Sequence, residues 1–143
     1  MRLTELLVAL VLVMQSVSGR TCPDSRTAED AIAKLHTWAD LHATFKSLAA
    51  CDDGGIAEGW SEFVTRTLAR KWNTVAELQK LVSTDRSFRL FVVRHVDATA
   101  DEQDLRQVLT NARNRCARSD RSLCAELEGA ANRSLASLTP GQR

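Results

Sequence analysis

The chain contains very little proline and no tyrosine. Only Pro23 and Pro140 are prolines among its 143 residues, and both lie outside the segment from Thr27 to Leu138. Because a proline inside a helix removes a backbone hydrogen bond, the absence of proline leaves that segment free to be helical. Strand-like alternation of apolar and polar residues is also absent, and apolar residues recur at three- and four-residue spacing. The sequence therefore predicts an all-α protein.

Capping residues and apolar stripes divide this segment into about five to six helices. The first is expected to run unbroken from Thr27 to Ala50, because its apolar stripe continues from Ile32 to Leu48. The other stripes lie at Ile56–Leu68, Val75–Val82, Phe88–Val96, Leu105–Cys116 and Leu123–Leu138, and the helix that carries the first of these is expected to end near Trp72. No repeat, linker or low-complexity tract separates them, so we expect one compact bundle.

The first nineteen residues have the layout of a secretory signal peptide. Arg2 precedes the apolar run Leu6–Met14, and the small-residue segment Ser16–Gly19 follows it. This run is too short to span a bilayer as a helix, which takes about 20 residues. We therefore expect residues 1–19 to be a cleaved signal peptide and residues 20–143 to form a single domain, periplasmic or secreted, with no stable membrane span.

All four cysteines follow the expected cleavage site, and an even number in an exported chain predicts two disulfides. If the first helix is straight, its length of about 36 Å keeps Cys22 and Cys51 too far apart to be bridged. A local bridge between Cys116 and Cys124 is feasible but would leave the other two cysteines unpaired. We therefore expect the pairs Cys51–Cys116 and Cys22–Cys124.

The charges of the expected mature chain nearly cancel. The full sequence holds 19 basic and 18 acidic residues, and removing Arg2 and Glu5 with the signal peptide leaves 18 and 17. A dedicated nucleic-acid-binding domain is usually strongly basic, so nucleic acid is not an expected partner. Asn132 begins an Asn-Arg-Ser pattern that is a glycosylation acceptor only in a eukaryotic source.

The chain carries no recognisable catalytic or metal-binding motif. His36 and His42 are six residues apart and point to different faces of a helix, whereas a metal-binding pair on a helix needs a spacing of three or four. His95 lies on an inward-facing stripe, which favours a hydrogen-bonded core histidine. The sequence has no close cysteine pair of the zinc type and no Gly-x-Ser-x-Gly segment. We predict no catalytic residue, metal or cofactor.

The most concentrated acidic group lies early in the second expected helix. It consists of Asp52, Asp53, Glu58 and Glu62, with Trp60 among them. Aspartates at this position have a sufficient structural role, because they cap helix N-termini and favour the positive end of the helix dipole. A functional interpretation is an acidic lip that binds a partner with Trp60 as its anchor, since tryptophan is enriched among interface hot spots.

One segment resembles a known family of exported helical proteins. Cys51-Asp52-Asp53-Gly54, followed by Gly59-Trp60 and by later cysteines, is similar to periplasmic immunity proteins that protect bacteria against amidase effectors of type VI secretion. The resemblance covers about ten residues and the overall layout. It implies a small disulfide-bonded helical protein that inhibits a cell-wall amidase by binding it, and it assigns no inhibitory residue.

We therefore expect a non-enzymatic protein that binds another protein, with an envelope-acting toxin as one such partner. Two alternatives stay open. The first is a small envelope enzyme that uses Asp52, Asp53, Glu58 or His42, and the second is a carrier that holds an apolar ligand between helices.

Overall fold

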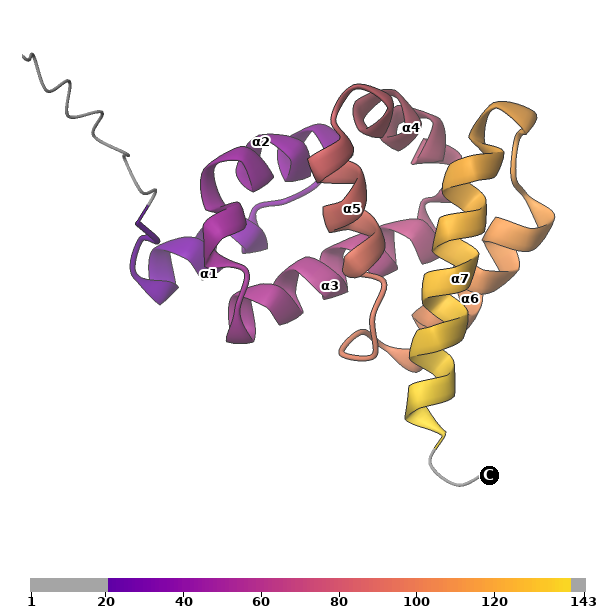
Figure 1. The fold of residues 1–143 in the computed structure, drawn as a ribbon. Helices are drawn as coiled ribbons and strands as arrows, with labels where there is room; N and C mark the ends of the chain where they lie inside the picture. The colour runs from indigo at the N-terminus through magenta and orange to yellow at the C-terminus, as the bar shows by residue number, and fades with distance from the viewer. Residues whose placement is uncertain (1–20, 140–143) are drawn as a thin grey trace, which may run out of the picture.

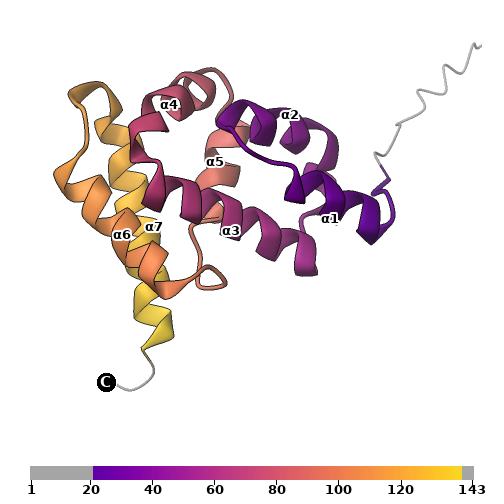
Figure 2. The same ribbon diagram turned by 180° about the vertical axis from the view of Figure 1, so that it is seen from behind.

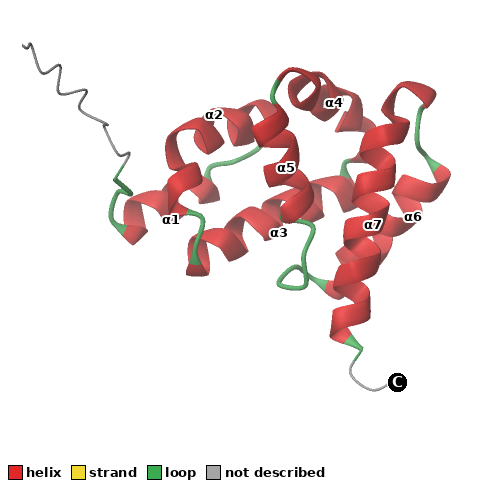
Figure 3. Ribbon diagram, viewed as in Figure 1, coloured by secondary structure: helices red, strands yellow, loops and turns green. Residues whose placement is uncertain are grey.

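The computed structural model describes residues 21–139, and the expected signal peptide lies outside this range. Figure 3 shows helices joined by loops, with no strand in the described part of the chain. Seven α-helices follow one another between residues 21 and 139: α1 (Ser25–Ala33), α2 (Trp38–Leu48), α3 (Gly54–Arg70), α4 (Val75–Thr84), α5 (Arg86–Arg94), α6 (Glu102–Asn114) and α7 (Arg121–Leu138). Short 3-10 turns occur at Ala49–Cys51, Trp72–Thr74 and Arg118–Asp120. The all-α prediction is confirmed.

The long helix α3 organises the molecule. Seen from both sides, α1 and α2 lie at the N-terminal end of α3, and the antiparallel pair α6 and α7 lies at its C-terminal end (Figures 1 and 2). Helices α4 and α5 lie between these two groups. Among residues 21–139, no helix has both the length and the apolar character needed to cross a membrane.

The prediction of one continuous helix from Thr27 to Ala50 is wrong, because the first helix ends at Ala33, with Lys34 as its C-cap, and a second helix begins at Trp38. Thr37 and Asp40 form a capping box: the Thr37 hydroxyl accepts from the Asp40 amide at 3.1 Å, and the Asp40 carboxylate accepts from the Thr37 amide at 2.9 Å. This box starts a new helix in place of continuing the old one. Helix α2 consequently runs back over α1 (Figure 1).

The reversal also overturns the expected disulfide pairing. The bridges are Cys22–Cys51, with Cα atoms 5.4 Å apart, and Cys116–Cys124, with Cα atoms 6.2 Å apart. The expected pairs Cys51–Cys116 and Cys22–Cys124 rested on a straight first helix of about 36 Å. Because the helix folds back on itself, its two ends meet, and the local bridge between α6 and α7 no longer leaves any cysteine unpaired.

Aromatic side chains link the helices at the centre of the core. Phe91 of α5 lies edge-to-face with Trp60 of α3, at 5.2 Å between ring centroids, and 4.8 Å from the ring of Phe45 in α2. Two tryptophans also join distant parts through their ring nitrogens: Trp38 donates to the Thr74 hydroxyl at 2.8 Å, and Trp72 donates to the Arg115 carbonyl at 3.0 Å. Buried aromatic rings of this size dominate the energetics of a small core.

Candidate functional site

The acidic residues singled out in the sequence do not form a single lip. Asp53 caps α3, its carboxylate accepting from the Gly54 amide at 2.8 Å. Glu58 and Glu62 lie one turn apart on the exposed side of α3, where Glu62 pairs with Arg66. Asp52 faces the other way, towards α5. The structure therefore separates Asp52 from the two glutamates.

Trp60 belongs to the core. Its side chain is 0% exposed and packs against Phe91. A side chain with no exposed surface cannot contact a partner in this conformation. Trp60 is therefore not proposed as an interface anchor. The indole Nε1 has no hydrogen-bond partner among the described residues, which leaves one buried donor unsatisfied.

Asp52 takes part in a buried polar network centred on His95, the residue at the C-terminal end of α5. The His95 Nε2 atom lies 3.2 Å from both carboxylate oxygens of Asp52, and Arg94 pairs with the same carboxylate. On the other side of the ring, His95 Nδ1 lies 2.9 Å from the Ser61 hydroxyl. The expectation that His95 is a hydrogen-bonded core histidine is confirmed.

The Ser61 hydroxyl contacts three polar groups. Its oxygen lies 2.7 Å from the Asp97 carboxylate and 3.1 Å from the Ala57 carbonyl, in addition to its contact with His95. The Asp97 carboxylate and the Ala57 carbonyl compete for the single hydroxyl proton, and the direction of the bond to His95 depends on the histidine tautomer. The network nevertheless ties together α3, the turn before it and the loop after α5, so its main effect is to fix these segments against each other.

Burial and hydrogen bonding lower the pKa values of two groups in this network, His95 and Asp97. Burial lowers the pKa of His95 below its ordinary value, and the nearby Asp52 carboxylate offsets only part of that effect. Burial opposes ionisation of Asp97, but hydrogen bonds from Thr99 and Ser61 outweigh it and lower the pKa of the Asp97 carboxyl. At neutral pH the network therefore holds a neutral histidine between carboxylates.

Serine, histidine and aspartate in contact invite comparison with hydrolytic triads, in which the serine hydroxyl must meet a substrate. Here Ser61 is 1% exposed and lies in the middle of α3, where its hydroxyl also points to the Ala57 carbonyl. No substrate can reach the oxygen in this arrangement. The network is better explained as a set of positioning contacts.

A groove with a volume of about 460 Å³ lies between α1 and α3. Its floor is apolar and consists of Ile32, Leu35 and Phe63. Phe63 is half-buried and lies edge-to-face on Trp38 at 6.0 Å between centroids. The volume lies within the range of about 300–1,000 Å³ that is typical of ligand sites.

A glycine allows the two walls of this groove to approach. A Cβ atom placed on Gly59 would lie only 3.0 Å from the Cγ2 atom of Ile32, closer than real side chains normally pack. The helices therefore meet through a position that has no side chain. Gly59 precedes Trp60 in the segment singled out from the sequence, but its contact with Ile32 joins two separate helices and depends on how α1 packs against α3.

Charged residues line both rims of the groove. Its acidic residues are Glu29 and Glu62, its fixed cations are Arg66, Arg70 and Lys71, and His36 is also at the rim. Arg66 pairs with Glu62, and Arg70 pairs with Asp104 on α6 at 3.1 Å. Glu29 and Lys71 form no ion pair with any residue in the described range.

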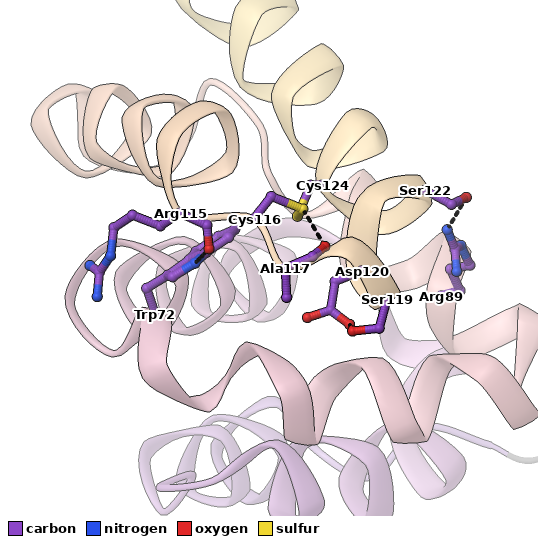
Figure 4. The surroundings of a disulfide bond; sticks show 9 residues. All are labelled: Trp72, Arg89, Arg115, Cys116, Ala117, Ser119, Asp120, Ser122 and Cys124. Carbon is purple, nitrogen blue, oxygen red and sulfur yellow. Dashed lines mark hydrogen bonds between the residues drawn. A yellow bond between two sulfur atoms is a disulfide. The ribbon is translucent and has the colours of Figure 1, made fainter.

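The second disulfide lies at the turn between α6 and α7 (Figure 4). Beside it, the Trp72 ring nitrogen donates to the Arg115 carbonyl, and Arg89 donates to the Ser122 hydroxyl at 2.9 Å. The bridge and these bonds hold the turn against the 3-10 turn that precedes α4 and against α5. Within residues 21–139 no group of three histidine, cysteine or acidic side chains is placed to hold a metal ion.

No protein-family model matches this chain, and neither the curated proteins nor the solved structures give a significant match. Residues 21–139 thus form a small, all-α, disulfide-bonded fold with a charged-rim groove between α1 and α3.

Proposed function

We propose that this chain is an exported protein that acts by binding another protein, and that its partner is an envelope-acting toxin such as a peptidoglycan amidase, which it inhibits. Two disulfides are typical of an oxidising compartment outside the cytoplasm. A periplasmic or secreted location agrees with the signal-like residues at the start of the sequence. The segment that resembles amidase immunity proteins lies at the start of α3, beside the groove.

The observation that carries the proposal is the groove between α1 and α3. Protein interfaces typically combine an apolar centre with a polar and charged rim. The groove has this layout, with Ile32 and Phe63 at its centre and Glu29 and Lys71 at its ends. Of the acidic residues expected to bind a partner, Glu62 lies on its rim, whereas Asp52 and Asp53 are engaged within the fold.

The proposal is tested by capturing the partner and measuring what happens to its activity. The oxidised exported protein is immobilised, and an envelope extract of the producing cells is passed over it. We expect a retained protein whose peptidoglycan-hydrolysing activity falls when the purified chain is added in equimolar amount. If no protein is retained, or if a retained hydrolase keeps its full activity in the saturated complex, the proposed inhibition is wrong.

A carrier function would give a different result in the same preparation. An apolar ligand bound in the groove would co-purify with the chain and would appear in an organic extract of the pure protein. Mass spectrometry of that extract therefore separates a carrier from a binding protein.

A further inference from the structure

We infer that the groove between α1 and α3 receives an extended segment of the partner protein that carries an acidic residue at one end, apolar side chains in the middle and a basic residue at the other end. This inference rests on the proposed protein-binding function and names the chemistry of the bound segment. Of the groove residues, only Glu62 belongs to the acidic group that the sequence pattern indicates.

The length of the groove fits a short peptide. Along α3 its lining runs from Gly55 to Lys71, sixteen residue steps, or about 24 Å at a rise of 1.5 Å per residue. An extended chain of about seven residues covers the same distance. The walls are held together by the packing of the Ile32 side chain against Gly59 and by the Cys22–Cys51 bridge, which ties the segment before α1 to the turn before α3. The groove is therefore preformed, and binding does not have to order it.

The order of charges along the groove gives the segment a direction. Glu29 lies at the end beside Gly55, since its carboxylate oxygen would be 3.8 Å from a Cβ atom placed there. Lys71 lies at the opposite end, beside Arg70. Both Glu29 and Lys71 are exposed, and neither has an ion-pair partner within residues 21–139. A bound segment with an acidic group near Lys71 and a basic group near Glu29 forms an ion pair with each of these two residues.

The middle of the groove selects apolar side chains. Ile32 and Phe63 are partly exposed and face this space, and Leu35 lies beneath them. Arg66 and Glu62 neutralise each other along the rim, so the centre presents little net charge. Apolar side chains of the bound segment gain free energy here by leaving water.

Other ligand classes fit this lining less well. Nucleic acid binding relies on several cations free to contact phosphates, but Arg66 and Arg70 are paired with carboxylates of the same chain. A fatty acyl chain needs an apolar tunnel, whereas charged side chains interrupt both rims here. A peptide that alternates charge and apolar surface matches the lining along its whole length.

The test uses a displayed library of random peptides selected on the oxidised protein, followed by affinity measurements on the enriched peptides as fluorescent conjugates. We expect enriched peptides to combine an acidic, an apolar and a basic position. Lys71→Glu should weaken their binding about tenfold, because reversing an exposed charge replaces an attraction by a repulsion. Replacing the peptide's acidic residue by lysine should restore binding to Lys71→Glu and weaken binding to the unchanged protein.

Two controls keep this result interpretable. Lys80→Glu makes the same charge change on the exposed side of α4, outside the groove, and should leave peptide affinity unchanged. Glu29→Lys should weaken the same peptides through their basic residue. The melting temperature of each variant shows that the loss does not come from unfolding, since all three positions are exposed.

The outcomes separate this inference from the proposed function. If no peptide is enriched, or if enriched peptides bind Lys71→Glu and Glu29→Lys as tightly as the unchanged protein, the inference is overturned. A toxin that is captured and inhibited equally well by those two variants would leave the proposed function standing on another surface. If the unchanged protein also fails to inhibit the toxin, both the inference and the proposed function are wrong.

Discussion

His95 and Asp52 are 43 residues apart in the sequence, yet the histidine Nε2 atom lies 3.2 Å from the aspartate carboxylate. This contact joins the end of α5 to the turn that carries the first disulfide, and Ser61 extends it to the middle of α3. The geometry of the groove's α3 wall therefore depends on a polar network that is itself buried. Conditions that disturb this network should therefore lower the free energy of unfolding of the protein.

The protein should become less stable as the pH falls below about 6.5. The folded-state pKa of His95 is lowered by burial, so the unfolded chain takes up a proton first, at the ordinary histidine pKa of about 6.5. This contribution to the free energy of unfolding is fully present above that pH and is lost as the pH falls towards the folded pKa. Asp97, whose pKa is also lowered, adds a second loss at pH values below about 4.

Urea unfolding measured between pH 8 and pH 5 checks this direction. His95→Gln should reduce stability at pH 8 and should flatten its dependence on pH between 7 and 5. His36→Gln, which removes an exposed histidine outside the network, should keep the slope of the unchanged protein. A protein that gains stability on acidification in this range would contradict the account.

The two disulfides should contribute unequally to stability. Cys22–Cys51 closes a loop of 29 residues and Cys116–Cys124 a loop of 8. In the chain-entropy model these loops correspond to about 3.5 and about 2.5 kcal/mol. Paired cysteine-to-serine variants should therefore lose stability in that order in denaturant unfolding. Peptide mapping without reduction tests the pairing itself: fragments linking Cys51 to Cys116 would contradict the structure.

Two adjacent glycines at the start of α3 should respond to alanine in opposite directions. Gly54 has a φ of 52°, in the left-handed region, so Gly54→Ala should cost about 1 kcal/mol although nothing lies within 4 Å of the added Cβ. Gly55 has ordinary helical geometry and room for a Cβ, so Gly55→Ala should stabilise the fold by about 0.5–1 kcal/mol. Equal effects at the two positions, measured by thermal unfolding, would rule out this helix start.

Substitutions of Trp60 should lower the stability of the fold and should not act through a direct contact with a partner. Trp60→Ala should cost about 3–5 kcal/mol, because it empties a fully buried site against Phe91. Trp60→Phe should cost less, since it keeps an aromatic ring and removes an indole N–H that has no partner among the described residues. Denaturant unfolding gives both values. A folded Trp60→Ala protein of undiminished stability would place this ring at the surface.

The sequence was sufficient for the fold class because helix-forming patterns are local. Apolar spacing and capping residues placed the starts of α3, α4 and α7 within a few residues of those observed. The break between α1 and α2 was missed because the apolar stripe continues through Leu35 and Trp38, although Thr37 and Asp40 had the spacing of a capping box. That single error caused the wrong disulfide pairs.

The site was less accessible to sequence reasoning because it depends on contacts between distant segments. The groove exists only where α1 lies against Gly59, and the His95 network joins residues from three segments. The acidic residues were expected to form one lip, but Asp52 lies in the turn before α3 whereas Glu62 lies within the helix, so the two face different neighbours. Asp52 consequently turned inwards while Glu62 reached the groove.

The most direct test of binding through the groove is backbone amide chemical-shift mapping of the isotope-labelled protein as the captured partner is added. The account predicts that the largest changes occur in α1 and along the side of α3 that bears Gly59, Phe63 and Lys71, while the α6–α7 turn beside Cys116–Cys124 stays unchanged. Changes centred on the α6–α7 turn, with the groove residues unaffected by a saturating partner, would contradict it.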